Sequence, residues 1–576
     1  MLMPPSLSYP GVYVEELPSG VRTIVGVPTS IAAFVGPAAW GPTDKPVRIT
    51  SFADFSRRFG AATEKNALGQ AVRQYYQNGG QEAVIVRITA AASSAQVPPA
   101  GGGAAAPPPG APKAATIKVA TKNADKKLTF VAKHPGSAGN GIRIRVDRNT
   151  RNPKDDTLYN LTIHDTLSGQ EEQYLNVTVG EAGPNSLPRL IKSSELVELD
   201  MTSTTADALK SAPMLNSTPQ GQSPWKDRPK APAAASGGGA AGGGAAAEPA
   251  TEAEYSYKSD NAGTDGSGAP PGDLDYLGGD GGDMAGKGVF ALRNETISFN
   301  ILCLPAKGAL GVPVWAAAAQ VCAERRAMLI VDPPPSATKD WGDVGTVANA
   351  YQGGFFDGIG DFRKNAVLYF PRLLAPGEDG PRTEFPPCGV MAGIWARTDA
   401  QRGVWKAPAG TEATVNGATD LALTMNNLEN GTLNVLGINC LRRFPIIGQV
   451  VWGARTMVGA DAQTSEWKYL PVRRLALFLE ESLYRGSQWI VFEPNDEPLW
   501  AQIRLNFGAF MHTLFRQGAF QGSTPKDAYF VKCDSETTTQ NDIDRGIVNI
   551  VVGFAPLKPA EFVVIQLQQM AGQIEV

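Results

Sequence analysis

Histidine is scarce in this chain of 576 residues, which contains only His134, His164 and His512. None of the three falls in the stretch 288–441. A Ser/His/Asp triad needs a histidine beside its nucleophile, so no such triad can be assembled within that stretch. Metal sites built from clustered histidines are excluded on the same ground. We therefore expect no catalytic residue and no metal site, and we interpret His512 as a surface or packing residue of a helix.

Cysteine is also rare, and its pattern excludes two further classes of site. The five cysteines are odd in number and far apart, and no two stand in a CxxC pair that would suggest zinc or redox chemistry. We expect all five to be reduced core residues of a protein folded in the cytosol. They are Cys303, Cys322, Cys388, Cys440 and Cys533.

The chain has neither a strong charge of one sign nor a long apolar run. Charged residues make up 19% of the sequence, the formal net charge is −4 and the pI is about 5.7. This balance argues against a general polyanion binder, so we expect no nucleic acid partner. No run of about 18 apolar residues occurs, and the start MLMPPSLSYPGVYV lacks a basic region followed by an apolar one. We expect a protein made without a Sec-type signal and without direct membrane insertion.

One segment has the spacing of a phosphate-binding loop, GGDMAGKG at 281–288. Gly288 stands where the magnesium-binding Ser or Thr should be, and an acidic, glycine-rich segment precedes the loop in place of an apolar strand. We interpret the segment as linker and expect no cofactor. Asp332, in LIVDPPP, follows an apolar strand, where α/β enzymes often place functional groups. A rigid proline turn is the simpler interpretation of that position.

Low-complexity composition divides the chain. Gly, Ala and Pro dominate 91–115 and 231–250, and an acidic, glycine-rich stretch extends the second tract, so we predict linkers at 91–115 and 231–287. Between them, strand-like segments such as TIKVAT, KLTFVAK and GIRIRVDR predict an inserted, mostly β domain at 116–230. Apolar strands alternate with helices over 288–440, and 23–90 shows the same pattern. Together these two parts predict one α/β core with a mostly parallel sheet covered on both faces.

The last region, 441–576, predicts an α+β domain. Two amphipathic helices are expected, the second at 498–517 with Asn495 or Asp496 as its cap. Strand-like alternation follows in two runs, the first with Val548, Ile550 and Val552 on one face. The second run, 561–568, ends close to the end of the chain and needs a partner strand; its apolar residues include Val563, Val564, Ile565 and Leu567. A short strand-like arm, GVYVEEL at 11–17, lies near the other terminus.

Arginine and tryptophan are interleaved in the second half of the chain. Both residue types are common interface anchors, but they also form intramolecular salt bridges and stacks. The sequence leaves both alternatives open for Arg397, Arg402, Arg442, Arg443, Arg455, Arg473 and Arg474, which alternate with Trp395, Trp405 and Trp452.

Phrases along nearly the whole chain resemble the contractile tail sheath proteins of phages and phage-like injection systems. They include YPGVYVEEL, SIAAFVGPAAWGP and FADFSRRFG near the start, and NILCLP, AERRAMLIVDPPP and NAVLYFPRL in the core. Further phrases are INCLRRFPIIGQVVWGARTM, WIVFEPND and GIVNIVVGFAPLKPAEFVVIQL. The linkers and much of the insert fall outside the resemblance.

The resemblance implies a core of subtilisin-like topology without catalytic function, an insert that faces outward, and an N-terminal arm, 1–22, that joins a C-terminal domain. It implies a structural subunit that polymerises around an inner tube and contracts to drive that tube through a target envelope. Terminal strands would pair with neighbouring copies, as backbone hydrogen bonding at a sheet edge allows. The residues implicated are Val12, Tyr13, Val14, Val548, Ile550, Val552, Val563, Val564, Ile565 and Leu567.

The resemblance also implies partners and a place. The partners would be copies of the chain itself in stacked rings, the inner tube protein, baseplate proteins and tail terminator or cap proteins. Arg504 and Arg516, on the helix 498–517, are candidate tube contacts. The protein would assemble in the cytoplasm of the producing bacterium and would then form part of a phage tail or tail-like particle. Two alternatives stay open: a static shell or tube protein, and a subtilisin-like hydrolase.

Overall fold

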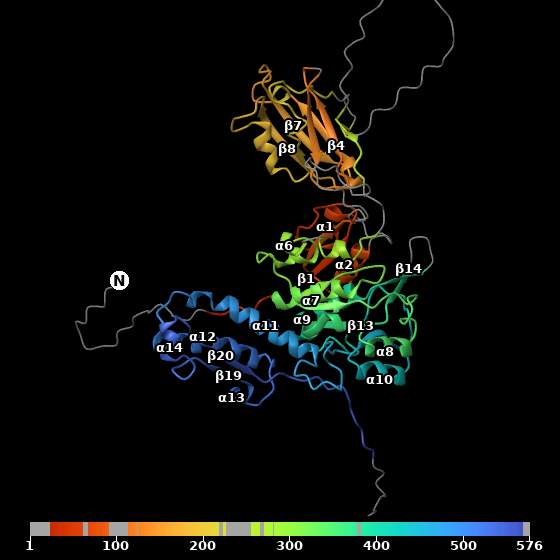
Figure 1. The fold of residues 1–576 in the computed structure, drawn as a ribbon, viewed down its shortest axis with the longest axis vertical. Helices are drawn as coiled ribbons and strands as arrows, with labels where there is room; N and C mark the ends of the chain where they lie inside the picture. Colours follow the sequence, from red (N-terminus) through yellow and green to blue (C-terminus); the bar gives the residue numbers. More distant parts are fainter. Residues whose placement is uncertain are drawn as a thin grey trace, which may run out of the picture.

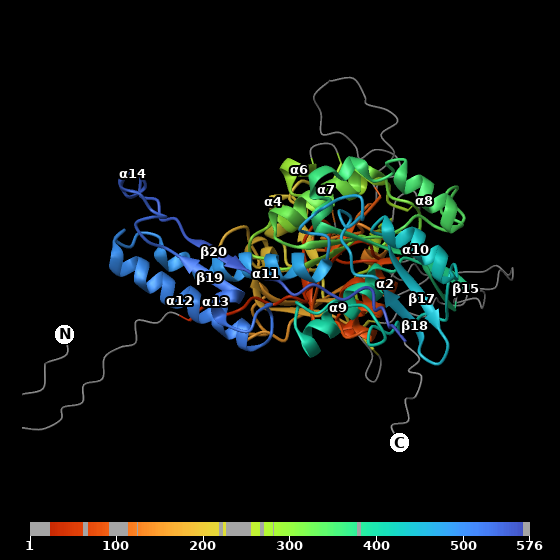
Figure 2. The same cartoon turned by 90° about the horizontal axis from the view of Figure 1, so that it is seen from below.

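A central sheet forms the core of the computed structural model, which describes residues 23–60, 67–90, 113–123, 125–217, 223–225, 255–264, 270–279, 282–376 and 382–567. The sheet has eight strands in the order β18-β17-β13-β12-β11-β1-β3-β2 (Figures 1 and 2). Pairing is parallel from β17 to β3, and the two edge strands β18 and β2 pair antiparallel. The strands are β1 (Ala32–Pro37), β2 (Val47–Ile49), β3 (Ala83–Ile88), β11 (Ile301–Cys303), β12 (Met328–Val331), β13 (Ala366–Phe370), β17 (Asn439–Phe444) and β18 (Gly448–Trp452).

Helices cover both faces of this sheet because its strands are apolar on both sides. Ala33 and Val35 of β1 join one buried cluster, whereas Phe34, between them, joins the other. The helices on the first side are α7 (Val312–Glu324), α8 (Val344–Gln352) and α10 (Asn427–Val435), with the 3-10 turns η3 (Gly288–Arg293) and η4 (Asp357–Asn365). The second side carries α1 (Phe52–Phe59), α2 (Ala67–Gln77) and α9 (Cys388–Arg402). The predicted doubly covered, mostly parallel sheet is confirmed.

A small antiparallel sheet lies beside the core, made of β14 (Leu373–Pro376), β15 (Arg382–Phe385) and β16 (Asp420–Leu421). Leu373, Phe385 and Leu421 extend the second buried cluster.

The insert packs two antiparallel sheets around its own buried cluster. One sheet has the order β10-β4-β5-β9 and the other β6-β7-β8. The strands are β4 (Thr116–Ala120), β5 (Lys127–Ala132), β6 (Ile142–Asp147), β7 (Leu158–Asp165), β8 (Glu171–Thr178), β9 (Val197–Leu199) and β10 (Ser259–Asn261), with α3 (Leu187–Leu190), α4 (Ala206–Leu209), η1 (Ser137–Gly141) and η2 (Ile191–Ser193) between them. Figure 1 shows the insert above the core.

Two parts of the predicted linker 231–287 are instead packed structure. Residues 255–264 belong to the insert, because β10 pairs with β4 and Tyr257 bridges to Ile144. Residues 270–279 belong to the core, where Tyr276 is buried. Aromatic side chains among glycines and acids anchor both stretches, and composition averaged over the segment hides them.

The loop-like motif at 281–288 follows a helix and not a strand. It consists of α6 (Gly282–Ala285) and a turn, and α5 (Asp273–Tyr276) precedes it. Gly288 adopts φ 59° and donates its N–H to Asp44. A phosphate cradle needs a strand, a loop and a helix in that order, which this segment lacks. The described part of the motif is a short helix against η3 and not the linker that was predicted.

The C-terminal domain consists of two long helices and a two-stranded sheet. Its elements are α11 (Leu470–Gly486), η5 (Gln488–Ile490), α12 (Glu497–Arg516), α13 (Pro525–Ala528), β19 (Tyr529–Lys532), α14 (Gln540–Asp544) and β20 (Val551–Phe554). Asp496 caps α12, accepting a hydrogen bond from the Leu499 N–H, as predicted. Residues 23–27, assigned by sequence to the α/β core, lie against this domain: Ile24 is in its buried cluster, and the Val27 N–H donates to Ser482 on α11.

All five cysteine side chains are buried, as predicted. Within the described ranges no helix is long and apolar enough to cross a membrane.

Candidate functional site

The carboxyl edge of the parallel sheet, where α/β enzymes bind their ligands, is filled here by a sealed polar cluster. Asp332 follows β12, is buried and accepts a hydrogen bond of 2.9 Å from the Cys388 N–H at the start of α9. Arg372 follows β13, and its guanidinium donates to backbone carbonyls, among them those of Pro333 and Lys307. Burial raises the pKa of Asp332 to about 6, against the hydrogen bond from Cys388 and the charge of Arg372. The cluster fixes loops to a helix.

The three histidines do not lie at this edge of the sheet. His134 lies in the insert, where burial first and then nearby cations lower its pKa to about 4. His164 stacks on Trp225 in the same domain, and His512 lies on α12. In the part of the chain that the structure covers, no three His, Cys, Asp or Glu side chains gather as metal ligands would. The candidate functional sites described below are exposed strand edges and exposed segments.

The sheet of the C-terminal domain has open edges. β19 and β20 pair over four residue pairs, and neither has a third strand beside it among the described residues. Its inner face packs on the buried cluster, whereas Phe530 and Val551 on its outer face are exposed. The Phe530 ring lies over Gly553, where an added Cβ would be 2.1 Å from it, so a larger residue at 553 would displace the ring. Open strand edges of this kind accept further strands.

An exposed aromatic residue stands on the loop next to this sheet. Phe492 is fully exposed and adopts φ 70°, a conformation that a bulky residue rarely takes. Asn495 of the same loop donates to the Ile547 carbonyl, four residues before β20, and accepts from Trp500. An exposed aromatic side chain held in a strained backbone indicates a contact that the isolated chain does not make.

The predicted arm residues fall into three groups. Val548, Ile550 and Val552 pack on the C-terminal cluster within the chain, on one face as the alternation predicted. The predicted strand 561–568 forms no ladder in its described part, 561–567, and that part is extended and exposed. The apolar residues 562–565 and 567 are 74–93% exposed; they are Phe562, Val563, Val564, Ile565 and Leu567. Val12, Tyr13 and Val14 lie outside the described residues.

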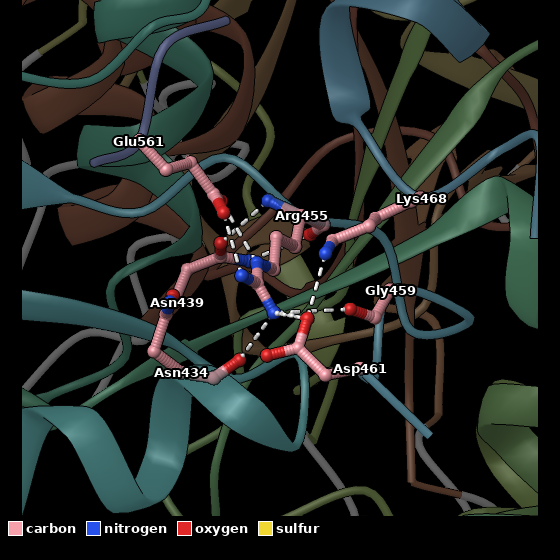
Figure 3. Close-up of polar contacts among 7 residues, drawn as sticks. All are labelled: Asn434, Asn439, Arg455, Gly459, Asp461, Lys468 and Glu561. Atoms are coloured by element: carbon pink, nitrogen blue, oxygen red, sulfur yellow. Dashed lines mark hydrogen bonds and ion pairs between the residues drawn. The ribbon is translucent and has the colours of Figure 1, made fainter. Parts of the chain in front are cut away.

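A buried arginine holds the root of this exposed segment (Figure 3). The Arg455 side chain is 0% exposed, and that of Glu561 is 16% exposed. Arg455 Nε donates to Glu561 Oε1 at 2.8 Å, and Nη2 donates to Oε2 at 2.5 Å. Nη1 donates to Asp461 at 2.9 Å and to the carbonyls of Asn434 and Gly459. Two parallel bonds from a guanidinium to one carboxylate are a strong and directional arrangement.

The main chain of Arg455 is fixed as firmly as its side chain. Asn439, at the start of β17, accepts from the Arg455 N–H at 2.7 Å and donates to the Arg455 carbonyl at 2.8 Å. Gly453 permits this approach, because an added Cβ would lie 2.8 Å from Asn439 Oδ1. The anchor therefore belongs to the central sheet, although Glu561 follows the C-terminal domain in the chain.

Charge is balanced around the anchor. Burial opposes the charged form of Arg455, but the hydrogen bonds that it donates to Glu561 and the charges of the nearby carboxylates outweigh burial, so the pKa of Arg455 is raised. A hydrogen bond from Lys468, at 2.6 Å, and then the charge of Arg455 lower the pKa of Asp461. Two cations and two carboxylates thus alternate across the site, which offsets the cost of burying the guanidinium.

The two predicted tube contacts differ in exposure. Arg504 is engaged within the chain: it donates to Glu497 at 2.6 Å and to the Cys533 carbonyl. Arg516, in the last turn of α12, is exposed and has no ion pair in the described structure.

All seven of the interleaved arginines have a partner within the chain, so intramolecular contacts are observed for each of them. Arg455 forms the anchor, Arg473 lies over Trp467, and Arg474 lies over Trp395 while pairing with Asp399. Sequence reasoning did not single out Glu561. The available signal was a lone carboxylate at the head of an apolar run, following Pro559 and Ala560.

Two family models match the chain over the core and the C-terminal domain. The phage tail sheath protein central domain matches residues 281–457, and the phage tail sheath C-terminal domain matches 462–570. The first model ends beyond Arg455 and the second spans Glu561, so the two partners of the anchor come from different matched domains.

Curated relatives and solved structures point the same way. A tail sheath protein of Vibrio phage KVP40 is 26% identical over 179 residues, which is 31% of this chain and 25% of that protein. The chain thus matches about a quarter of the length of this relative. A sheath tail protein from Listeria innocua shares the fold with a TM-score of 0.54 at 14% identity, covering 93% of this chain and 96% of that one. The sheath of an extracellular contractile injection system in its contracted state gives a TM-score of 0.50 at 19% identity, covering 98% of each chain.

Proposed function

This chain belongs to the contractile tail sheath family, and from that premise we propose that it polymerises helically around an inner tube through exchanged terminal segments and contracts to drive that tube through a target envelope. Tail sheath proteins are structural and not enzymes, and the sealed cluster around Asp332 agrees with such a role. Two observations together carry the proposal: the segment 562–567 is apolar and exposed, and the separate two-stranded sheet β19–β20 has open edges.

The free segment and the open sheet complement each other chemically. Residues 562–567 offer unpaired backbone groups and alternating apolar side chains, which suit pairing with another strand. β19 and β20 offer free edges, with Phe530, Val551 and Phe492 exposed around them. In the proposal the segment of one copy extends the two-stranded sheet of a neighbour, and residues 11–17 of another copy extend it further. Such a head-to-tail contact generates stacked rings or a helix in place of a closed dimer.

Contraction then becomes a rearrangement of connected rigid bodies. The core, the insert and the C-terminal domain each have a buried cluster of their own, whereas the segments that link copies are narrow. Subunits can rotate against one another while the exchanged strands stay paired. The extended sheath would be held in a metastable state by the tube and the baseplate, and contraction would release free energy as contacts between subunits grow.

The remaining partners and the place of assembly follow from the same proposal. Baseplate proteins and a tail terminator or cap would bind the two ends of the sheath, assembled in the cytoplasm of the producing bacterium. Arg516 is the better candidate tube contact of the two predicted arginines, because Arg504 is already engaged with Glu497. The core would share a subtilisin-like topology, and the insert would face outward.

Electron microscopy of purified particles tests the proposal. Co-expression with the inner tube protein is expected to give two kinds of particle, long and narrow or short and wide, each around a tube. Tubes of one length and one diameter under all conditions would favour a static shell. Labelling of the purified chain by a serine-directed covalent probe would instead favour a hydrolase.

A further inference from the structure

The segment between β20 and Glu561 is held at its two ends. At one end the Gln521 N–H donates to the Ala555 carbonyl at 2.9 Å, and Phe520 forms a bridge with Pro556. At the other end Glu561 binds Arg455. Among the described residues, 558–560 makes no hydrogen bond. We call residues 555–561 the strap.

The middle of the strap borders a groove and is not packed down. The groove has a volume of about 890 Å³ and is lined on the core side by Trp405, Trp452 and Arg442. Leu557 and Lys558, on the strap side, are exposed. Because the middle of the strap makes no bond, Glu561 alone fixes the point where the chain leaves the subunit.

We propose that the pair Arg455 and Glu561 is an anchor that delivers tension on the C-terminal segment to the central sheet of the same subunit and spares the β19–β20 ladder. The inference rests on the proposed function, in which residues after 561 pair with a neighbour. It divides the C-terminal region at one residue: 555–561 belongs to the subunit, and the donated part begins at Phe562.

A pull on residue 562 can reach the rest of the subunit along two paths. Without the anchor, the pull would reach β20, which is held by only four residue pairs in an antiparallel ladder. A ladder loaded from its end opens one pair at a time. With the anchor, the pull meets two charge-assisted bonds at a buried guanidinium. The main chain of Arg455 is bonded to Asn439 at the start of β17, and β17 pairs with β13 inside the central sheet.

The mobility of a spin label on the isolated, full-length subunit tests the anchor itself. The label sits at Ala560→Cys, an exposed position next to Glu561. Glu561→Gln keeps the shape of the side chain but removes its charge, and we expect the label to change from restricted to nearly free motion, while amides of β17 and β13 keep their protection from hydrogen exchange. Arg455→Lys, which cannot form the two parallel bonds, should do the same. Lys558→Gln, on the exposed middle of the strap, is the matched control. Unchanged label mobility in Glu561→Gln and Arg455→Lys would overturn the proposal.

A pulling experiment tests the path of tension. One handle sits at the C-terminus and the other at Ile446→Cys, in the exposed turn of the core hairpin. Wild type is expected to resist until the anchor breaks, whereas Glu561→Gln should first lengthen at low force, as the strap leaves the core. The same early lengthening in wild type would overturn the proposal. Both readouts use single subunits, so failure of the full-length chain to form sheaths would count against the proposed function alone.

Discussion

At the scale of single residues, Asp332 makes the stability of the core depend on pH. Its pKa of about 6 lies above the value near 4 of an aspartate in an unfolded chain, so the folded protein binds this proton more tightly. Its contribution is full below pH ~4 and is lost as the pH rises through about 6, a change of about 3 kcal/mol in the free energy of unfolding.

Asp332→Asn should remove that dependence, because an amide does not titrate and its oxygen can still accept from the Cys388 N–H. Guanidinium unfolding from pH 4 to 8 is expected to show a flatter profile for this variant than for wild type. Asp361→Asn, at an exposed position, serves as the control. Parallel profiles for Asp332→Asn and wild type would refute the account of this site.

Arg474 is a second residue whose burial makes a prediction. Its guanidinium binds Asp399 at 2.6 and 2.8 Å, and Thr29 adds a bond of 2.7 Å to the same carboxylate. Arg474→Met leaves Asp399 buried without a cation, so we expect a loss of about 3–5 kcal/mol in chemical unfolding. Arg474→Met with Asp399→Leu should recover much of that loss. A double variant no more stable than the single one would show that the pair is not the cause.

The sequence predicted which residues are buried better than it predicted which residues contact each other. The burial of the five cysteines followed from their number and spacing. The partner of Arg455 did not, because Glu561 lies 106 positions further along the chain and no local pattern joins the two. Ion pairs of this kind depend on how two domains dock, which periodicity does not describe.

At the scale of elements, the strands and helices with a clear local pattern were predicted, because the apolar run of β1 and the stripe of α12 are local properties. Other elements were not predicted, among them α9, α10 and β19, which is only four residues long. The predicted strand 561–568 forms no ladder within the described part of the chain, 561–567. A strand is defined by its neighbour, so a terminal strand that pairs between copies cannot form in one copy alone.

Phe492 gives a prediction at this scale. Asn tolerates φ 70° better than Phe, so Phe492→Asn should leave the stability of the subunit unchanged or raise it by up to about 1 kcal/mol. Assembly should weaken, because an exposed aromatic contact beside the open sheet is lost. Thermal unfolding and sedimentation measure the two effects separately. Met284→Asn, at an exposed apolar position on α6, is the control. Wild-type assembly by Phe492→Asn would remove this loop from the contact.

At the scale of the whole molecule, the core, the insert and the C-terminal domain each have their own buried cluster. The pair Arg455 and Glu561 fixes the residue after which the exposed segment begins. The α/β core and the insert were predictable from alternation and composition. The course of 555–561 from the C-terminal domain back to the core was not, because it depends on tertiary contacts at Pro556 and Glu561 (Figures 1 and 2).

The central claim, that copies join through the residues after Glu561, is tested most directly by a chain that stops at Glu561. This chain keeps the anchor and loses only the exposed segment. The account predicts a folded monomer by sedimentation, with the thermal stability of the full chain and no tubes in electron micrographs under conditions where the full chain forms them. Tubes of normal diameter from the shortened chain would contradict it.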